Sequence, residues 1–106
     1  MQAASAVAVE SEQTARVWIE ERDGSIARGS AVAVTAGGAR VRLDEKPGFD
    51  SGHEVSLRLC FRPGAPSVAI SARVAWVRSA GATNECGLEW TGSAEQRAAL
   101  APWLAA

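Results

Sequence analysis

Arginines at alternating positions are the residues of this sequence best suited to chemistry. Arg40, Arg42, Arg58 and Arg73 fall on polar positions of segments that alternate with apolar residues, so we expect them on the solvent face of strands. A guanidinium forms two parallel hydrogen bonds to a phosphate and stacks on a base, which makes an anion or nucleotide site one interpretation. Solvation and cross-strand pairing with acids is the other interpretation, and the more common role.

Catalytic groups are sparse in this sequence. His53 is the only histidine, and no nucleophile-elbow pattern accompanies it, so we expect a surface turn residue rather than a catalytic one. Cys60 and Cys86 lie within apolar alternation, and we expect free buried thiols; a hydrolase or transferase that uses one of them is an alternative with little support. Two cysteines and one histidine do not complete a four-ligand zinc site without carboxylates. The sequence therefore predicts no enzyme, no metal and no cofactor.

The composition describes one small domain. The chain has 106 residues, a formal net charge of -1 and 47% hydrophobic residues, which is ordinary for a single globular domain. Near-neutral charge excludes the broad cationic surface of a dedicated DNA or RNA binder. No apolar run approaches the roughly 20 residues that cross a membrane, and residues 1–14 lack the cations of a secretory signal. We expect a cytoplasmic protein without membrane insertion, with a flexible leader over 1–14 and one domain over 15–106.

Six segments have the period-two alternation of strands. Turn residues separate them, and Gly37-Gly38 predicts a tight turn or backbone at positive φ. Trp76 is expected to point inward with the apolar residues before it. Trp18 and Trp90 are expected in the core, with stacking on a ligand as the alternative. The predicted strands are residues 16–20, 29–36, 39–43, 54–61, 67–77 and 85–90.

A helix is predicted after the last strand. Ser93 is placed to cap the amide of Gln96, and Gln96 to reach back in a capping box. Pro102 predicts that the helix stops or kinks near residue 101, and Trp103 and Leu104 are expected to anchor the C-terminus. Six strands and one helix predict an all-β antiparallel barrel or sandwich whose short C-terminal α-helix covers an open end or edge.

The segment Val34–Val41 resembles the strand–turn–strand signature of PilZ domains. The other family segments follow in order: Gly52 with Val55-Ser56-Leu57, then Arg73–Val77, then Gly87–Trp90 and a helix from Ser93. The resemblance covers nearly the whole chain and implies a six-stranded antiparallel β-barrel of the split-barrel type with a C-terminal helix. It also implies bacterial signalling, because family members typically bind the second messenger cyclic di-GMP.

Two motifs carry nucleotide binding in that family: an RxxxR segment before the first strand and a D/N-x-S-x-x-G segment at the second turn. Arg16 matches the second arginine, but Glu12 stands at the first. Ala33 replaces the Asp or Asn, which accepts hydrogen bonds from guanine. The ligand-binding residues implied by the resemblance, with Arg40 as a further cation, are Arg16, Thr35, Gly38 and Arg40.

Two functions follow from these departures. Loss of one arginine and one acceptor removes roughly 2–5 kcal/mol of binding free energy. This favours an adaptor of the cyclic di-GMP receptor family that acts by protein–protein interaction with weak or no nucleotide binding. Its partner is expected in motility, pilus, polysaccharide or signalling machinery, and self-association into a homodimer through exposed strand edges stays open. The alternative is a cyclic di-GMP receptor with a modified site, in which Arg22 or Arg28 takes the place of the missing arginine.

Overall fold

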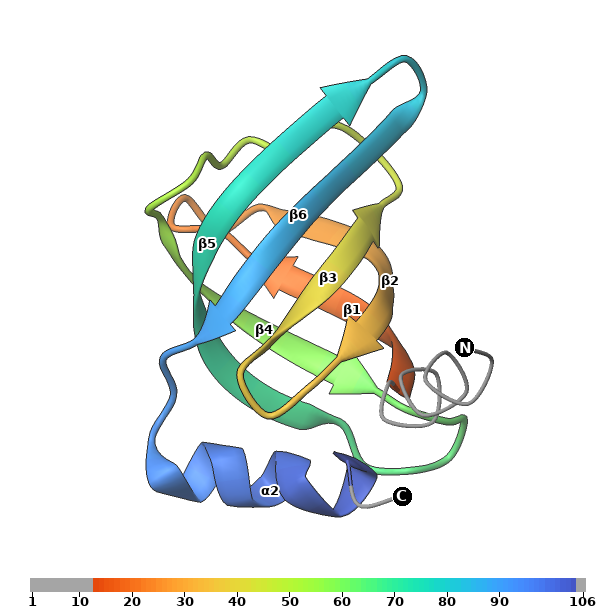
Figure 1. Cartoon of the computed structure of the whole chain (residues 1–106), viewed down its shortest axis with the longest axis vertical. Helices are drawn as coiled ribbons and strands as arrows, with labels where there is room; N and C mark the ends of the chain where they lie inside the picture. Colours follow the sequence, from red (N-terminus) through yellow and green to blue (C-terminus); the bar gives the residue numbers. More distant parts are fainter. Residues whose placement is uncertain (1–12, 105–106) are drawn as a thin grey trace, which may run out of the picture.

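The structure is a computed structural model that describes residues 13–104. Within these residues, six antiparallel strands close into a barrel in the order β1-β2-β3-β6-β5-β4, and one helix follows the last strand (Figure 1). The predicted barrel is confirmed and the sandwich is excluded. Of the predicted leader, Gln13 and Thr14 belong to β1, and residues 1–12 lie outside the described residues. The elements are β1 (Gln13–Glu20), β2 (Ile26–Val34), β3 (Gly38–Leu43), β4 (Glu54–Cys60), β5 (Val68–Ala80), β6 (Thr83–Trp90) and α2 (Ala94–Leu104).

Closure gives every strand of the barrel two hydrogen-bonded neighbours. Within residues 13–104, the sheet therefore has no open edge for α2 to cover. The exposed edges on which the expectation of a homodimer rested are absent from this part of the chain. A ligand or partner must therefore bind to outward side chains, to turns or to α2.

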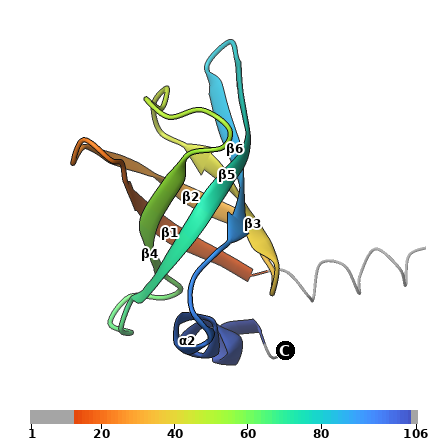
Figure 2. The same ribbon diagram turned by 90° about the vertical axis from the view of Figure 1, so that its left-hand side faces the viewer.

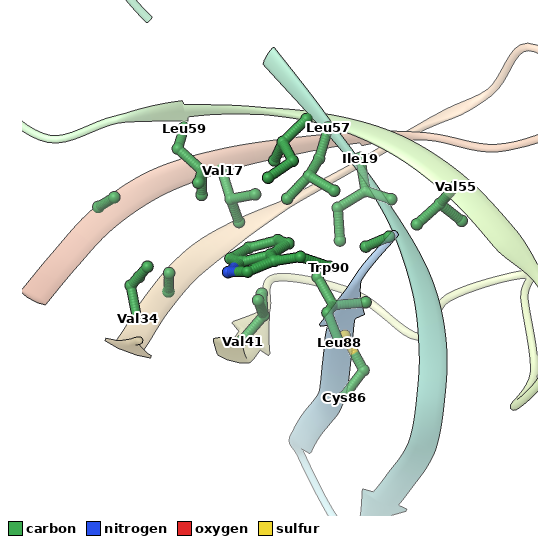
Figure 3. Packing of buried hydrophobic residues seen from close by; sticks show 14 of the residues in the cluster. Val17, Ile19, Val34, Val41, Val55, Leu57, Leu59, Cys86, Leu88 and Trp90 are labelled. Atoms are coloured by element: carbon green, nitrogen blue, oxygen red, sulfur yellow. The ribbon is translucent and has the colours of Figure 1, made fainter. Parts of the chain in front are cut away.

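Alternation along the strands builds the core of the barrel. In β4, Val55, Leu57 and Leu59 are buried, and the residues between them are exposed. Trp90 lies among the buried side chains (Figure 3), as predicted. Val17 and Ile19, the residues before and after Trp18 in β1, point inward, so Trp18 points outward and is 36% exposed. Its predicted core position is therefore wrong.

A β-bulge in β2 brings a small residue to the outer surface beside an arginine. Ala31 pairs with Val41, but the next pair is Ala33 with Arg40, so Val32 is the extra residue. The extra residue reverses the alternation after it. Since directly paired residues share a face of the sheet, Ala33 points to the same outer surface as Arg40.

A second bulge, in β5, moves a large aromatic side chain out of the core. Val74 pairs with Leu88 and Trp76 with Gly87, which leaves Ala75 as the extra residue. Trp76 consequently faces outward and is 37% exposed. The prediction that Trp76 continues the inward row of β5 is therefore wrong.

The turn between β2 and β3 is fixed onto β6. The backbone N–H of Trp90 donates to the Gly37 carbonyl at 3.1 Å, and its indole Nε1 donates to the Thr35 carbonyl at 2.9 Å. Gly38 lies so close to the Leu88 carbonyl that a Cβ there would collide with it. The predicted tight turn is confirmed, but neither Gly37 nor Gly38 has a positive φ. Close packing, not backbone conformation, is what requires a glycine at position 38.

Helix α2 lies across one end of the barrel (Figures 1 and 2). The Ser93 hydroxyl accepts a hydrogen bond from the Gln96 backbone N–H at 3.2 Å, which confirms the predicted cap. Gln96 does not reach back: its Oε1 accepts from the backbone N–H of Ser71 in β5 at 3.1 Å. The side chain expected to complete the capping box therefore links the helix to the barrel.

The last turn of α2 is held by apolar packing. Trp103 stacks on Phe61 with ring centroids 5.0 Å apart, and Leu104 also packs against the core, so the predicted anchors are confirmed. Pro102 lies inside this turn and the helix continues to Leu104, so the helix does not stop near residue 101. The other predicted outcome, a kink near that residue, stays a prediction. Pro102 removes one backbone hydrogen bond, and the contacts of Trp103 and Leu104 offset that loss.

Candidate functional site

The residues implied by the PilZ motifs lie on the outer surface of β1, β2 and β3 and at the turn that joins β2 to β3. Arg16 pairs with Ser30, and Ser30 pairs with Arg42, so these three side chains form one outward row. Arg40 lies two residues before Arg42 on β3 and faces outward in the next row. The structure thus brings Arg16 and Arg40 to one face, with β2 between them.

Arg16 is held by neighbours on this surface. Its Nη1 donates to Ser30 Oγ at 3.3 Å, and its Nη2 lies 4.0 Å from Asp44 Oδ2. Both side chains of the ion pair are more than half exposed, so it contributes about 0–1 kcal/mol to stability. A phosphate that approaches Arg16 would meet the negative charge of Asp44.

The Thr35 side chain closes its own turn. Its hydroxyl accepts from the Gly37 backbone N–H at 3.3 Å and donates to the Gly38 carbonyl at 3.4 Å. Its backbone N–H also donates to the Gly38 carbonyl, at 2.8 Å. The hydroxyl therefore has an intramolecular partner both as donor and as acceptor, and Thr35 and Gly38 have structural roles without any ligand.

The position of the missing acceptor lies beside Arg40. Ala33, where the motif has Asp or Asn, pairs directly with Arg40 and is 9% exposed. A methyl group accepts no hydrogen bond, so this position offers nothing to the N–H groups of a guanine. Glu12, the other departure from the motifs, lies outside the described residues.

Trp76 is the residue near Arg40 that the sequence interpretation missed. Arg40 pairs with Gly87, and Gly87 pairs with Trp76. The indole lies so close over Gly87 that a Cβ there would collide with it, and the Arg78 guanidinium lies 5.5 Å from its ring centroid. The available signal was Gly87, because a glycine inside a strand often marks close approach by another group.

A buried carboxylate organises the arginines of this surface. Glu85 Oε1 accepts from Arg78 Nη2 at 2.7 Å, and its Oε2 lies 3.8 Å from Arg42 Nη2. The hydrogen bond from Arg78 lowers the pKa of Glu85 against the opposing effect of desolvation, so the carboxylate is ionised at neutral pH. No described carboxylate lies within 4.0 Å of the Arg40 guanidinium. We call this surface the Arg40 face; it comprises Arg40, Arg42, Trp76, Arg78 and Glu85.

His53 and Cys86 are placed as expected, whereas the expectation that Cys60 is buried is wrong. His53 is exposed, and its Nδ1 accepts from the Asp50 backbone N–H at 3.2 Å. Both cysteines are free thiols; Cys60 is half-buried, and burial raises the pKa of the Cys86 thiol to about 12. Over residues 13–104, no three His, Cys, Asp or Glu side chains gather as metal ligands, and no helix is long and apolar enough to span a bilayer.

The described residues form a closed antiparallel barrel with a helix over one end and an arginine-rich outer face. The sequence matches the family model of the PilZ domain over residues 13–106. The chain belongs to the PilZ domain family, the receptors and adaptors of cyclic di-GMP signalling. Domains of this family generally serve as binding or adaptor units.

Two solved structures have the same fold. One is the Bacillus subtilis inhibitor of motility, MotI/DgrA, with 20% identity and a TM-score of 0.69 over 88% of this chain and 46% of that one. The other is the PilZ domain of CeSA from a cellulose-synthesizing bacterium, with 20% identity and a TM-score of 0.67 over 88% and 91%. This chain therefore spans about half of MotI/DgrA. A comparison with curated protein sequences finds no match.

Proposed function

We propose that this chain is a PilZ adaptor domain that acts through protein–protein interaction and binds cyclic di-GMP weakly or not at all. The observation that carries the proposal is that the motif residues retained in this sequence make contacts within the fold. The Thr35 hydroxyl closes its own turn, and Gly38 packs on β6. Ala33 supplies no acceptor beside Arg40. The contacts that these residues make within the fold explain their presence without a bound nucleotide.

A partner in motility, pilus, polysaccharide or signalling machinery fits this role. Of the similar structures, MotI/DgrA is an inhibitor of motility, and the other is a domain of CeSA from a cellulose-synthesizing bacterium. An adaptor needs no catalytic group or cofactor, so the proposal includes that the chain is not an enzyme. The proposed place of action is the cytoplasm.

Isothermal titration calorimetry with cyclic di-GMP at near-physiological salt tests this proposal. We expect no saturable heat at high protein concentration. Micromolar or tighter binding that Arg16→Ala abolishes would contradict the proposal. Lys46→Ala is the matched control, because it removes an exposed cation in the loop after β3, outside the Arg40 face.

A cyclic di-GMP receptor with a modified site is the second candidate function. The observation that favours it is that only Gly87 separates Arg40 from the exposed indole of Trp76. A guanidinium next to an indole suits a phosphate next to a base. In the same titration, this function predicts saturable binding that Arg40→Ala and Trp76→Ala each weaken at least about tenfold, the effect of losing one charge-assisted or stacking contact.

A further inference from the structure

A second surface lies on the side of the barrel away from the Arg40 face. The strand order places β1 and β4 across the barrel from β3 and β6, and Figure 2 shows β1, β4 and β5 on this side. A hollow of about 230 Å³ lies over these strands next to α2. We call it the Trp18 groove; its lining includes Trp18, Glu20, Ile26, Ser56, Arg58 and Gln96.

The Trp18 groove exposes large apolar side chains. Trp18 is 36% exposed and Ile26 is 50% exposed, although both lie on strands of a well-packed barrel. The only other large apolar side chain with comparable exposure among the described residues is Trp76, on the Arg40 face. Neighbouring exposed apolar groups of this size are typical of surfaces that contact another molecule.

One arginine lines this groove beside the indole. Trp18 pairs with Arg58 on β4, which lines the groove, and with Arg28 on β2, which lines the adjoining hollow together with Glu21, Asp44 and Glu45. No carboxylate of residues 13–104 lies within 4.0 Å of either guanidinium. In contrast, Arg73 on β5 is paired with Glu89. The groove therefore combines the Arg58 guanidinium with exposed apolar area.

The distribution of charge along the groove selects among anionic occupants. Glu20 pairs with Ile26 next to the apolar surface, so one end of the groove repels a second negative charge. A uniformly charged polymer such as a nucleic acid has a phosphate at every step and is disfavoured there. A peptide supplies an acidic side chain opposite Arg58, away from Glu20, and an apolar side chain opposite Trp18 and Ile26.

We propose that the Trp18 groove docks an acidic peptide segment of a partner protein, with at least one apolar side chain placed on the indole. This inference rests on the proposed adaptor function and names the chemical class of its partner. Arg58 binds the acidic side chain of the segment, since a charge-assisted hydrogen bond from guanidinium to carboxylate is the strong polar contact available there. Trp18 supplies an exposed aromatic anchor that the bound segment covers, as at binding hot spots.

Selection from a displayed library of linear dodecapeptides tests the proposal, with the full chain as the target. Enriched peptides are labelled and titrated with purified protein by fluorescence anisotropy. We expect the enriched peptides to combine Asp or Glu with a large apolar residue. Arg58→Glu should weaken their binding at least about tenfold, because an attraction becomes a repulsion, and Trp18→Ala should weaken it similarly. Arg62→Glu makes the same change of charge outside the groove and should leave the affinity unchanged.

Several outcomes would overturn the proposal. One is a selection that enriches no acid-rich peptides. Another is an affinity for the enriched peptides that Arg58→Glu does not alter, when the variant keeps the melting temperature of the parent protein. The third is that the protein binds a labelled single-stranded oligonucleotide and does not bind acidic peptides. The nucleotide titration responds to Arg16 and Arg40, whereas peptide capture responds to Trp18 and Arg58. Failure of the groove proposal is therefore distinguishable from failure of the adaptor proposal.

Discussion

Gly37 and Gly38 are adjacent in the sequence, but their surroundings differ. A Cβ on Gly38 would collide with the Leu88 carbonyl, whereas a Cβ on Gly37 would meet nothing within 4 Å. We expect Gly38→Ala to lower the free energy of unfolding by about 1–3 kcal/mol, as overpacking does. Gly37→Ala should be neutral or stabilising by up to about 1 kcal/mol, since it restricts the unfolded chain. Urea unfolding of both variants measures the difference.

The adjacent glycines are matched controls for each other. Equal losses in the two variants would show that the turn conformation, and not the approach of β6, requires glycine. The expected asymmetry would mean that Gly38, although it matches a nucleotide-binding motif, is retained for packing.

Cys60 and Cys86 differ in access and in acidity. Cys86 is buried, and burial raises the pKa of its thiol to about 12. Cys60 is half-buried, and its Sγ donates to the Arg62 carbonyl at 3.3 Å. Because the thiolate is the reactive form, iodoacetamide should label Cys60 first under native conditions and Cys86 only after unfolding. Mass spectrometry of the labelled peptides checks this order, and rapid native labelling of Cys86 would contradict it.

At the scale of elements, alternation makes the straight strands predictable. In β4 the apolar residues fall on every second position, and the structure buries those residues. The bulges in β2 and β5 are not predictable in this way, because one extra residue shifts an apolar side chain to the opposite face without changing the composition of the segment. Trp76 was assigned to the core for that reason.

The β5–β6 hairpin was also only partly predicted. The sequence indicated a loop from residue 79 to 84, but the strands pair as far as Ala80 and Thr83. This end of the hairpin projects beyond the barrel (Figure 1), and residues 78–83 are all exposed. A ribbon without a core on either face has no reason to alternate apolar and polar residues, so the strand signal is absent there.

Helix α2 should depend on its N-cap. Ser93 Oγ satisfies the Gln96 backbone N–H, and replacing an N-cap serine by alanine costs about 1 kcal/mol. We expect Ser93→Ala to lower the free energy of unfolding by that amount in urea titrations. Ser79→Ala, on the exposed end of β5, is the control and should have no measurable effect. Equal effects of the two substitutions would argue against the capping role.

At the scale of the whole molecule, Glu85 connects pH to stability. The hydrogen bond from Arg78 lowers the pKa of Glu85 below its ordinary value of 4.5. As pH falls below about 4.5, the unfolded chain takes up this proton before the folded one does. The stabilisation is therefore present above that pH and is lost as pH falls through the folded-state pKa.

Glu85→Gln removes this titration. The urea midpoint of the variant should change less between neutral and acidic pH than that of the parent protein. Glu45→Gln, at an exposed loop position, serves as the control and should keep the parent pH dependence. An unchanged pH dependence in Glu85→Gln would show that the carboxylate does not contribute to acid sensitivity.

The residues of the candidate site were predictable only where they belong to one continuous segment of the sequence. Arg16, Thr35 and Gly38 were found from local motifs. The proximity of Arg40 to Trp76 depends on β6 pairing with both β3 and β5, and on a bulge in β5. The flanking of Trp18 by Arg28 and Arg58 depends likewise on pairing among three strands. Contacts of this kind depend on the register of the closed sheet and cannot be predicted from any single segment.

Closure of the barrel makes the backbone ladder independent of the outward side chains. The backbone of each strand is bonded to two neighbours, so replacing an outward side chain disturbs neither the ladder nor the interior. Mutations on the outside are therefore free to accumulate, and selection can act on them one residue at a time. This freedom accounts for chains with 20% identity that share the same barrel.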